Sequence, residues 1–340
     1  MLGHSAGEGV THGRQGETLS NMGHPGVGRI SRIAVQGCIV GRVRGVRYDM
    51  TNSGSTNGDV KARKVWFITG ASTGFGRLLA EEVLKAGGRV VATARRVEQI
   101  AELTREYPET ARAFALDVTK PAQIDAVAHD AIAAFGRIDV LVNNAGYGIA
   151  GGIEEATEKE FLPVFETNVL GLIRVTRAFL PQFRKQREGN ILMLSSVAGL
   201  IGGAGWGYYN TSKFAVEGFS EALAQEMAPL GVKVSIIEPG PFRTDFLGRS
   251  AAVIERVIPE YESTVSTART WVAGESGKQR GDPLKAVHAM MDLAESANPP
   301  LHLILGAVAY NRFKGKLDKW REEMAAYESV TLGADFPEGQ

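Results

Sequence analysis

The alternation of two kinds of segment along residues 64–310 limits most strongly what this chain can fold into. Short runs of apolar and β-branched residues alternate with longer segments in which apolar residues recur at helical spacing. Near-continuous apolar strands separated by helices form a parallel sheet that helices cover on both faces. We therefore predict an α/β fold, a single doubly wound domain with a seven-stranded parallel sheet and helices on both faces. The predicted strands lie at 64–69, 89–94, 111–118, 139–146, 190–196, 232–240 and 301–306, and the predicted helices at 75–87, 97–107, 121–135, 158–187, 208–229 and 282–297.

The first 60 residues do not follow this pattern. Residues 1–49 hold 11 glycines, six arginines, no lysine and only three acidic residues, without a sustained apolar period. Such a composition buries too little apolar surface to fold, so we predict that residues 1–60 are a disordered or mis-assigned N-terminal extension. Two alternatives stay open: an Arg-rich, acid-poor stretch fits an organelle-targeting peptide, and the true start could be Met50.

The remaining chain divides into two parts. We expect the doubly wound domain to span 61–310, with a substrate lid inside it at about 241–281. After the last predicted strand the chain continues, and we expect a C-terminal helical extension at 311–340.

Charge and cysteine content exclude several classes of partner. The 38 basic and 38 acidic side chains balance, which gives no support to a nucleic-acid-binding face. The single cysteine, Cys38, allows no intrachain disulfide and fits a reducing compartment. No uninterrupted apolar run reaches the roughly 18 to 20 residues of a membrane span. We therefore expect a cytoplasmic protein with no membrane span, and we expect no metal site.

A glycine-rich turn follows the first predicted strand and opens the first predicted helix. The sequence there is TGASTGFG, Thr69 to Gly76, with glycines at 70, 74 and 76. Glycine lets the backbone turn tightly and approach a ligand closely, and a helix N-terminus offers free N–H groups to an anion. A turn in this strand-to-helix context predicts binding of the pyrophosphate of a dinucleotide.

Five further motifs follow this turn in order: NNAG at 143–146, Asn168 within TNVLG, Ser196 thirteen residues before Tyr209, the YxxxK pair Tyr209 and Lys213, and PGxxxT ending at Thr244. Together with TGxxxGxG, they resemble the short-chain dehydrogenase/reductase family over roughly residues 64–310. The resemblance implies a Rossmann-type domain. The long segments before and after the last strand resemble the hydroxysteroid- and retinol-dehydrogenase-like branch of that family.

The resemblance implies catalytic roles for Asn168, Ser196, Tyr209 and Lys213. Tyr209 would exchange a proton with the substrate oxygen, and Ser196 would hold that oxygen. An unperturbed tyrosine titrates near pH 10, so a nearby ammonium such as Lys213, four residues along a helix, would be expected to lower its pKa. Asn168 would hold a water that links Lys213 to solvent. Tyr208 is expected to pack or to face the substrate.

The end of the second predicted strand indicates which nicotinamide cofactor binds. An acidic residue there would accept hydrogen bonds from the ribose, but this chain has Arg95, whose planar guanidinium suits a 2′-phosphate. We therefore predict a preference for NADP(H) over NAD(H). Asp117 and Val118 resemble the pair that contacts adenine, although Asp117 could instead cap the helix that begins near Pro121. The expected cofactor-binding residues are Gly70, Ser72, Thr73, Gly74, Phe75, Gly76, Arg95, Asp117, Val118, Asn144, Ala145, Gly146, Tyr209, Lys213, Pro239, Gly240 and Thr244.

Apolar residues in the predicted lid and in one neighbouring loop indicate the substrate class. They are Phe242, Phe246, Leu247, Val253, Ile254, Ile258, Tyr261 and Trp271 in the lid, and Leu200, Ile201 and Trp206 in the loop. A pocket of this kind favours an apolar ketone, aldehyde or secondary alcohol, although the same residues could simply pack the lid on the core. We expect an NADP(H)-dependent oxidoreductase acting on CH–OH or C=O. Because members of the family it resembles commonly pair through two long helices, we also expect a homodimer or homotetramer. The alternatives are a 3-oxoacyl-thioester reductase and a non-catalytic NADP(H)-binding sensor.

Overall fold

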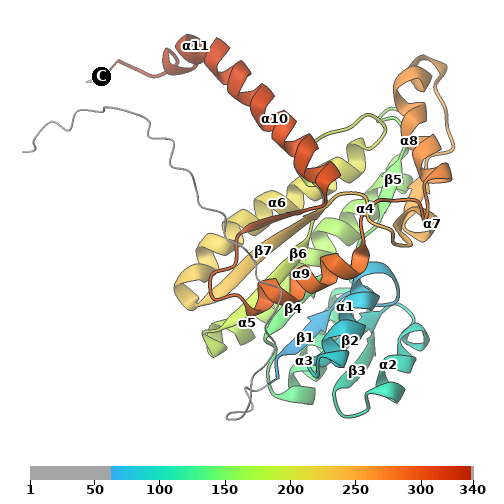
Figure 1. The fold of residues 1–340 in the computed structure, drawn as a ribbon, viewed down its shortest axis with the longest axis vertical. Coiled ribbons are helices and arrows are strands. Elements are labelled where there is room, and N and C mark those ends of the chain that lie inside the picture. Colours follow the sequence, from blue (N-terminus) through green and yellow to red (C-terminus); the bar gives the residue numbers. More distant parts are fainter. Residues whose placement is uncertain (1–62, 338–340) are drawn as a thin grey trace, which may run out of the picture. The chain divides into compact units, whose positions relative to one another are not determined.

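Seven parallel strands form one sheet at the centre of the domain (Figure 1). The structure is a computed structural model that describes residues 63–337. The strand order is β3-β2-β1-β4-β6-β7-β9, so the chain winds outward from β1 in both directions. This confirms the predicted doubly wound α/β fold. The strands are β1 (Val65–Ile68), β2 (Arg89–Ala94), β3 (Ala111–Ala115), β4 (Val140–Asn143), β6 (Gly189–Leu194), β7 (Val232–Pro239) and β9 (His302–Leu305).

Helices cover both faces of the sheet because successive strand residues point to opposite sides. In β1, Trp66 and Ile68 pack with α1 and α9, whereas Val65 and Phe67 pack with α3, α5 and α6. Every residue of β1, β4 and β6 is buried, as expected of a strand covered on both faces. The covering helices are α1 (Gly74–Lys85), α2 (Ala101–Glu106), α3 (Pro121–Phe135), α4 (Glu158–Phe165), α5 (Leu172–Gln186), α6 (Gly207–Met227) and α9 (Pro283–Glu295).

One predicted helix differs from the structure in a way that concerns the site. The segment predicted as a single helix at 158–187 contains a π-helical turn, η2 (Glu166–Gly171), between α4 and α5. π-Helical turns inside helices are frequent at functional sites. Here the turn contains Asn168, whose side chain is buried.

The predicted lid region consists of several short elements. These are α7 (Phe246–Arg249), β8 (Ala251–Val253) and α8 (Glu262–Gly274). Strand β8 pairs in parallel with β5 (Gly148–Ala150), which follows directly from β4. This two-stranded ribbon, which the sequence pattern did not predict, attaches the segment to the carboxyl edge of the main sheet.

The last two helices of the described residues are α10 (Ala307–Ala326) and α11 (Glu328–Leu332). Within them only Ala309 is buried, and it packs close to Gly240 at the end of β7. The prediction for residues 1–60 lies outside the described residues. Among the helices from 63 to 337, none is long and apolar enough to cross a membrane.

Candidate active site

The glycine-rich turn lies between β1 and α1 and is closely packed. Gly70 and Gly74 adopt positive φ angles of 67° and 58°, which favour glycine. A Cβ added to Gly76 would lie 2.6 Å from the Gly70 carbonyl oxygen and 2.5 Å from Asn144 Nδ2. Asn144 Nδ2 in turn donates to the carbonyls of Thr69 and Gly70 at 2.8 and 3.0 Å. The NNAG motif after β4 therefore holds the turn in place.

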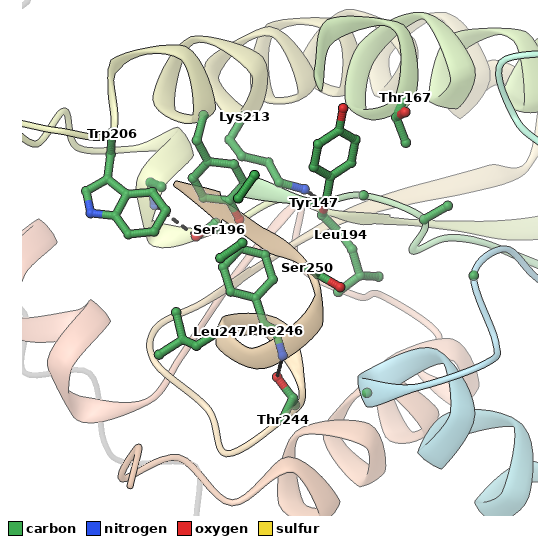
Figure 2. A pocket seen from close by; sticks show the side chains of 18 of the residues that line it. Tyr147, Thr167, Leu194, Ser196, Trp206, Lys213, Thr244, Phe246, Leu247 and Ser250 are labelled. Atoms are coloured by element: carbon green, nitrogen blue, oxygen red, sulfur yellow. Dashed lines mark hydrogen bonds between the residues drawn. The ribbon is translucent and has the colours of Figure 1, made fainter. Parts of the chain in front are cut away.

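Tyr209 and Lys213 lie one turn apart in α6, and Ser196 faces them from the end of β6. Tyr209 is 8% exposed and Lys213 is 6% exposed. Lys213 Nζ donates to the carbonyl oxygen of Leu194 at 2.6 Å and lies 5.9 Å from the Tyr209 ring centroid. Ser196 Oγ donates to the Pro239 carbonyl at 3.4 Å. Figure 2 shows Ser196 and Lys213 beside the same space.

Burial controls the pKa values of this group. Burial raises the pKa of Tyr209 to about 12, and its hydrogen bond with Ser196 offsets only part of that rise. Burial also lowers the pKa of Lys213 to about 8, although the charge of Glu217 opposes the change. The sequence-based expectation that Lys213 lowers the phenol pKa is therefore wrong for the protein without a bound cofactor. The ammonium is bonded to Leu194, and desolvation of the phenolate dominates.

Asn168 lies behind the site and joins two of its parts. Its Nδ2 donates to the Tyr147 carbonyl at 2.8 Å and to Ser212 Oγ at 3.1 Å, and its Oδ1 accepts from Tyr147 N at 3.0 Å. Both amide hydrogens are therefore used within the protein, and only an oxygen lone pair stays available for a water. Asn168 links the segment after β4 to α6, next to Tyr209 and Lys213.

A single cavity of about 1800 Å³ joins these parts. Two predicted site residues, Gly76 and Asn168, do not line it. Ser196 does, and so do all the other predicted cofactor-binding residues, namely Gly70, Ser72, Thr73, Gly74, Phe75, Arg95, Asp117, Val118, Asn144, Ala145, Gly146, Tyr209, Lys213, Pro239, Gly240 and Thr244.

Arg95 and Asp117 line this cavity after the ends of β2 and β3. Arg95 directly follows β2 and is exposed. Asp117 Oδ1 accepts hydrogen bonds from Thr119 N at 2.9 Å and Thr119 Oγ1 at 2.7 Å. Burial works against ionisation of Asp117, but these bonds and nearby cations including Arg95 hold its pKa below its ordinary value. The N-cap residue of α3 is Lys120, so Asp117 does not cap that helix.

Aromatic side chains surround Tyr209 on the other side. The Trp206 and Phe246 rings lie 5.8 and 5.7 Å from the Tyr209 ring between centroids, and Trp271 lies 5.9 Å from Trp206. Figure 2 shows Trp206, Phe246 and Leu247 around one space. Of the predicted apolar residues, Phe242, Phe246, Leu247, Trp271, Ile201 and Trp206 line the cavity, whereas Leu200, Val253, Ile254, Ile258 and Tyr261 do not.

Tyr208 turns away from the cavity, as a packing residue does. Its ring stacks on Phe161 at 4.2 Å, and its hydroxyl donates to the Ile153 carbonyl at 2.8 Å.

Three buried glutamates near the site were not identified from the sequence. Glu155 accepts from Gly152 N at 2.5 Å and Ile258 N at 2.9 Å, and it pairs with Arg269 of α8. Glu217 and Glu238 lie behind Ser195 and Lys213. Gly152 and Lys213 are close in the sequence to these glutamates. Ile258, Arg269 and Ser195 lie on other elements, so no local pattern indicates their contacts.

Comparison with known proteins identifies the family. The sequence signature described as short chain dehydrogenase matches residues 64–253. This chain belongs to the short-chain dehydrogenase/reductase family. It is 38% identical over 268 residues to Oxidoreductase BOA17 of Botryotinia fuckeliana (strain B05.10), covering 76% of this chain and 97% of that protein.

Two other relatives show the breadth of the family. A 3-ketodihydrosphingosine reductase of Bacteroides thetaiotaomicron is 35% identical, with 76% of this chain and 93% of that protein covered. Short-chain dehydrogenase/reductase family 9C member 7 of Bos taurus is 36% identical, with 75% and 82% covered. These relatives agree with an enzyme that interconverts C=O and CH–OH groups.

Solved structures support the same conclusion. A short-chain dehydrogenase from Streptomyces avermitilis superposes with a TM-score of 0.76 at 44% identity, covering 81% of this chain and 99% of that one. An enzyme from Burkholderia phymatum in complex with NAD gives 0.65 at 25% identity, covering 82% and 98%. A metagenomic oxidoreductase in complex with NADP gives 0.57 at 28%, covering 71% and 96%. The last two of these neighbours bind nicotinamide cofactors, one of them NAD and the other NADP.

The residues of this chain fit such a cofactor. The glycine turn lines the cavity and packs tightly on the NNAG segment, since a Cβ on Gly70 would lie 3.0 Å from the Ala145 Cα. A Cβ on Gly146 would lie 3.0 Å from Asn168 Oδ1 and 3.7 Å from Lys213 Nζ. The glycine turn would hold the pyrophosphate, and Lys213 would face the nicotinamide riboside.

Proposed function

We propose that this enzyme is an NADP(H)-dependent oxidoreductase for an apolar ketone, aldehyde or secondary alcohol, with Tyr209 as the general acid and base. The observation that carries the proposal is the single cavity shared by Tyr209, Ser196, Lys213, the glycine turn and Arg95. When bound, the cofactor supplies or accepts the hydride at the substrate carbon. The chain itself must position the substrate oxygen and move one proton.

In the reducing direction, Tyr209 gives its phenolic proton to the carbonyl oxygen, so a C=O group becomes an alcohol. Ser196 donates a hydrogen bond to the same oxygen and stabilises the negative charge that develops there. With a pKa near 12, Tyr209 stays protonated at neutral pH and is ready to act as the acid. In the oxidising direction the phenolate must accept the proton, and the Lys213 ammonium stabilises that phenolate.

Removing the phenol tests the catalytic role. A Tyr209→Phe substitution keeps the ring between Trp206 and Phe246 but deletes the transferred proton, so we expect kcat to fall by about 10² to 10⁴. Tyr208→Phe is the matched control, because Tyr208 does not line the cavity, and it should retain nearly full turnover. A Tyr209→Phe enzyme with wild-type kcat would rule out Tyr209 as the proton donor.

The NADP(H) preference rests on Arg95. Its guanidinium lines the cavity beside the end of β2, where a 2′-phosphate of the cofactor would lie. We expect Arg95→Ala to raise the KM for NADPH about ten-fold and to leave the KM for NADH nearly unchanged. Arg96→Ala is the matched control, since Arg96 is exposed but does not line the cavity. Equal effects of the two substitutions would refute the role of Arg95.

The substrate class rests on the aromatic side of the cavity. Trp206 and Phe246 pack beside the Tyr209 ring, and together with Trp271 they belong to one apolar cluster. The relative named 3-ketodihydrosphingosine reductase is, by its name, a reductase of a 3-keto compound, which also supports a carbonyl substrate. A 3-oxoacyl-thioester reductase and a non-catalytic NADP(H) sensor are the alternatives.

One assay separates these possibilities. Oxidation of NADPH and of NADH is followed by absorbance with apolar ketones, aldehydes, quinones and a short 3-oxoacyl thioester. Consumption of NADPH with the apolar carbonyls is the expected result. Preference for the thioester would favour the first alternative. Binding of NADPH without turnover in either direction, over a matching panel of alcohols, would favour the sensor.

The expected homodimer or homotetramer also stays a proposal. Leu162 and Leu170, on the α4–η2 segment, and Phe214 on α6 are 49%, 39% and 41% exposed. These apolar side chains lie on the helices through which family members pair, so a second copy of the chain would cover them.

A further inference from the structure

Two buried carboxyl groups lie directly behind the catalytic side chains and take no part in the proposed reaction. Glu217 is in α6, one turn after Lys213, and Glu238 is in β7, next to Pro239. Glu217 is 5% exposed and Glu238 is fully buried. Buried carboxyl groups are costly unless they are neutralised or hydrogen-bonded, so their contacts need an explanation.

Each carboxyl group has one oxygen with a partner and one without. Glu217 Oε1 accepts a hydrogen bond from Ser195 Oγ, and Ser195 immediately precedes Ser196. Glu238 Oε1 lies 2.6 Å from His302 Nδ1. The Oε2 atoms of both glutamates have no hydrogen-bond partner among the described residues. One carboxylate oxygen from each of Glu217 and Glu238 and one ring nitrogen of His302 all lie within 4.8 Å of one another.

A single proton explains both unpartnered oxygens. Two carboxylates this close cannot both ionise in a buried site, so one of them keeps a proton at neutral pH. Burial raises the pKa of Glu238 to about 8, and burial raises that of Glu217 to about 7. If the proton lies between the two carboxyl groups, it gives each Oε2 atom a partner and leaves one negative charge on the pair.

The other charged groups that face the pair come from two elements. Lys213 of α6 interacts with Glu217, and Glu221 of α6 interacts with Glu238. His302 of β9 lies 3.8 Å from Glu217 Oε2 and 3.9 Å from Glu221 Oε1. Among these groups, Lys213 is the cation that belongs to the proposed reaction.

We propose that Glu217 and Glu238 share one proton and act as a positioning pair that fixes the end of β6 and keeps Lys213 charged. This inference rests on the proposed function of Tyr209 and Lys213. The pair connects the three segments that carry the site: the end of β6 with Ser195 and Ser196, α6 with Lys213, and the end of β7 before Pro239. Its single negative charge favours the ammonium form of Lys213.

The space around the pair supports a positioning role. A Cβ added to Gly199 would lie 2.6 Å from Ser195 Oγ and 2.8 Å from Glu217 Oε1. The turn after Ser196 is therefore packed directly on the bond between Ser195 and Glu217. A change in that bond would displace the turn that sets the position of the Ser196 hydroxyl.

Glutamine substitutions separate a shared proton from two full charges. Glu217→Gln or Glu238→Gln leaves one carboxylate, and the new amide N–H can occupy the place of the shared proton. The double variant Glu217→Gln/Glu238→Gln removes the negative charge altogether. We expect the pKa of Lys213 to fall by about half a unit or more in the double variant and to change little in Glu238→Gln, which keeps the Glu217 carboxylate whose charge acts on Lys213.

The readout needs no substrate. Trace acetylation of Lys213 across pH 6 to 11, followed by peptide mass spectrometry, reports its pKa even if every carbonyl tested proves inert. The inference is therefore tested separately from the proposed function. When turnover is available, the pH profile of kcat/KM for alcohol oxidation should move to lower pH in the double variant. Thermal denaturation and NADPH binding confirm that each variant is folded.

Three results would overturn the inference. A double variant with the wild-type Lys213 pKa would show that the pair does not act on Lys213. A large shift in Glu238→Gln would show that Glu238 carries a full charge of its own. A stoichiometric metal ion in the purified enzyme, lost on Glu238→Gln, would show that a cation and not a proton joins the pair. Glu221→Gln is the matched control, since this half-exposed carboxylate on α6 is screened by solvent and should give a smaller shift.

Discussion

The Glu155→Gln substitution should loosen the lid and destabilise the fold. The Glu155 carboxylate is fully buried and joins three segments: Gly152 N and Ile258 N donate to it at 2.5 and 2.9 Å, and Arg269 of α8 pairs with it. Glutamine has the same shape, but one acceptor oxygen becomes an N–H donor. That donor faces either another N–H group or the Arg269 guanidinium, so at least one contact is lost.

The magnitude follows from burial. Breaking a buried ion pair by removing one partner costs about 3 to 5 kcal/mol. The Arg269 side chain is 16% exposed, so water can solvate part of it, and we take the lower end, about 3 kcal/mol. For a domain of this size, 1 kcal/mol changes Tm by roughly 2 °C, so we expect a decrease of about 6 °C. The KM for an apolar substrate should rise as well, because α8 carries Trp271.

The dependence on pH gives a second test. Burial alone would raise the pKa of Glu155, but hydrogen bonds from Ile258 and Gly152 and the Arg269 charge outweigh it and hold the pKa below the ordinary value of 4.5. The stabilisation is therefore present above pH 4.5 and is lost as the pH falls through the lower pKa of the folded protein. The difference in Tm between wild type and variant should shrink in acid.

The assay is thermal denaturation followed by circular dichroism from pH 7 to pH 4, with substrate kinetics at neutral pH. Glu154→Gln is the matched control, because Glu154 is exposed and its carboxylate accepts a hydrogen bond from the Tyr261 hydroxyl at 2.6 Å. It should change Tm by no more than about 1 °C. A Glu155→Gln enzyme as stable as this control at pH 7 would refute the reasoning.

Two further predictions concern the reaction itself. Trp206→Ala removes the ring between Tyr209 and Trp271, so the KM for a bulky apolar ketone should rise about ten-fold while the KM for NADPH stays constant. Trp320→Ala is the control, because Trp320 is half-exposed on α10. Equal effects of the two substitutions on the ketone KM would refute the assignment of Trp206 to the substrate site. For reduction, kcat should be constant near neutral pH and fall above about pH 8 as Lys213 loses its proton, whereas oxidation should speed up with pH as the Tyr209 phenolate becomes accessible. A reduction rate that is unchanged to pH 10 would contradict the role given to Lys213.

The fold could be predicted because its signal is local. Each buried strand is a short apolar run, such as VWFI of β1, and each helix between strands has its own apolar period. The parallel order then follows from the need to cover both faces of the sheet. The motifs at the carboxyl ends of β1, β4, β6 and β7 meet at one edge of that sheet, so their positions in sequence also predict their meeting in space.

The π-helical turn and the lid ribbon could not be predicted in the same way. Residues 158–187 keep a helical period throughout, and the extra residue that places Asn168 against Tyr147 and Ser212 changes no local preference. The pairing of β5 with β8 joins two three-residue segments that are about a hundred residues apart, too short for any alternation to appear. Both features depend on tertiary contacts.

The electrostatics of the site show the same limit most clearly. The sequence places a lysine one turn from a tyrosine, and the simple expectation is a phenol with a lowered pKa. In the folded chain, Lys213 is instead directed to the Leu194 carbonyl, and burial raises the pKa of Tyr209. A phenol of this kind is a proton donor at rest and becomes a base only when further positive charge reaches the cavity. The oxidised nicotinamide carries such a charge, so the direction of proton transfer would follow the redox state of the cofactor. The Glu217–Glu238 pair would keep Lys213 charged. Lys213 would then set the pKa of Tyr209 when the nicotinamide is reduced and uncharged.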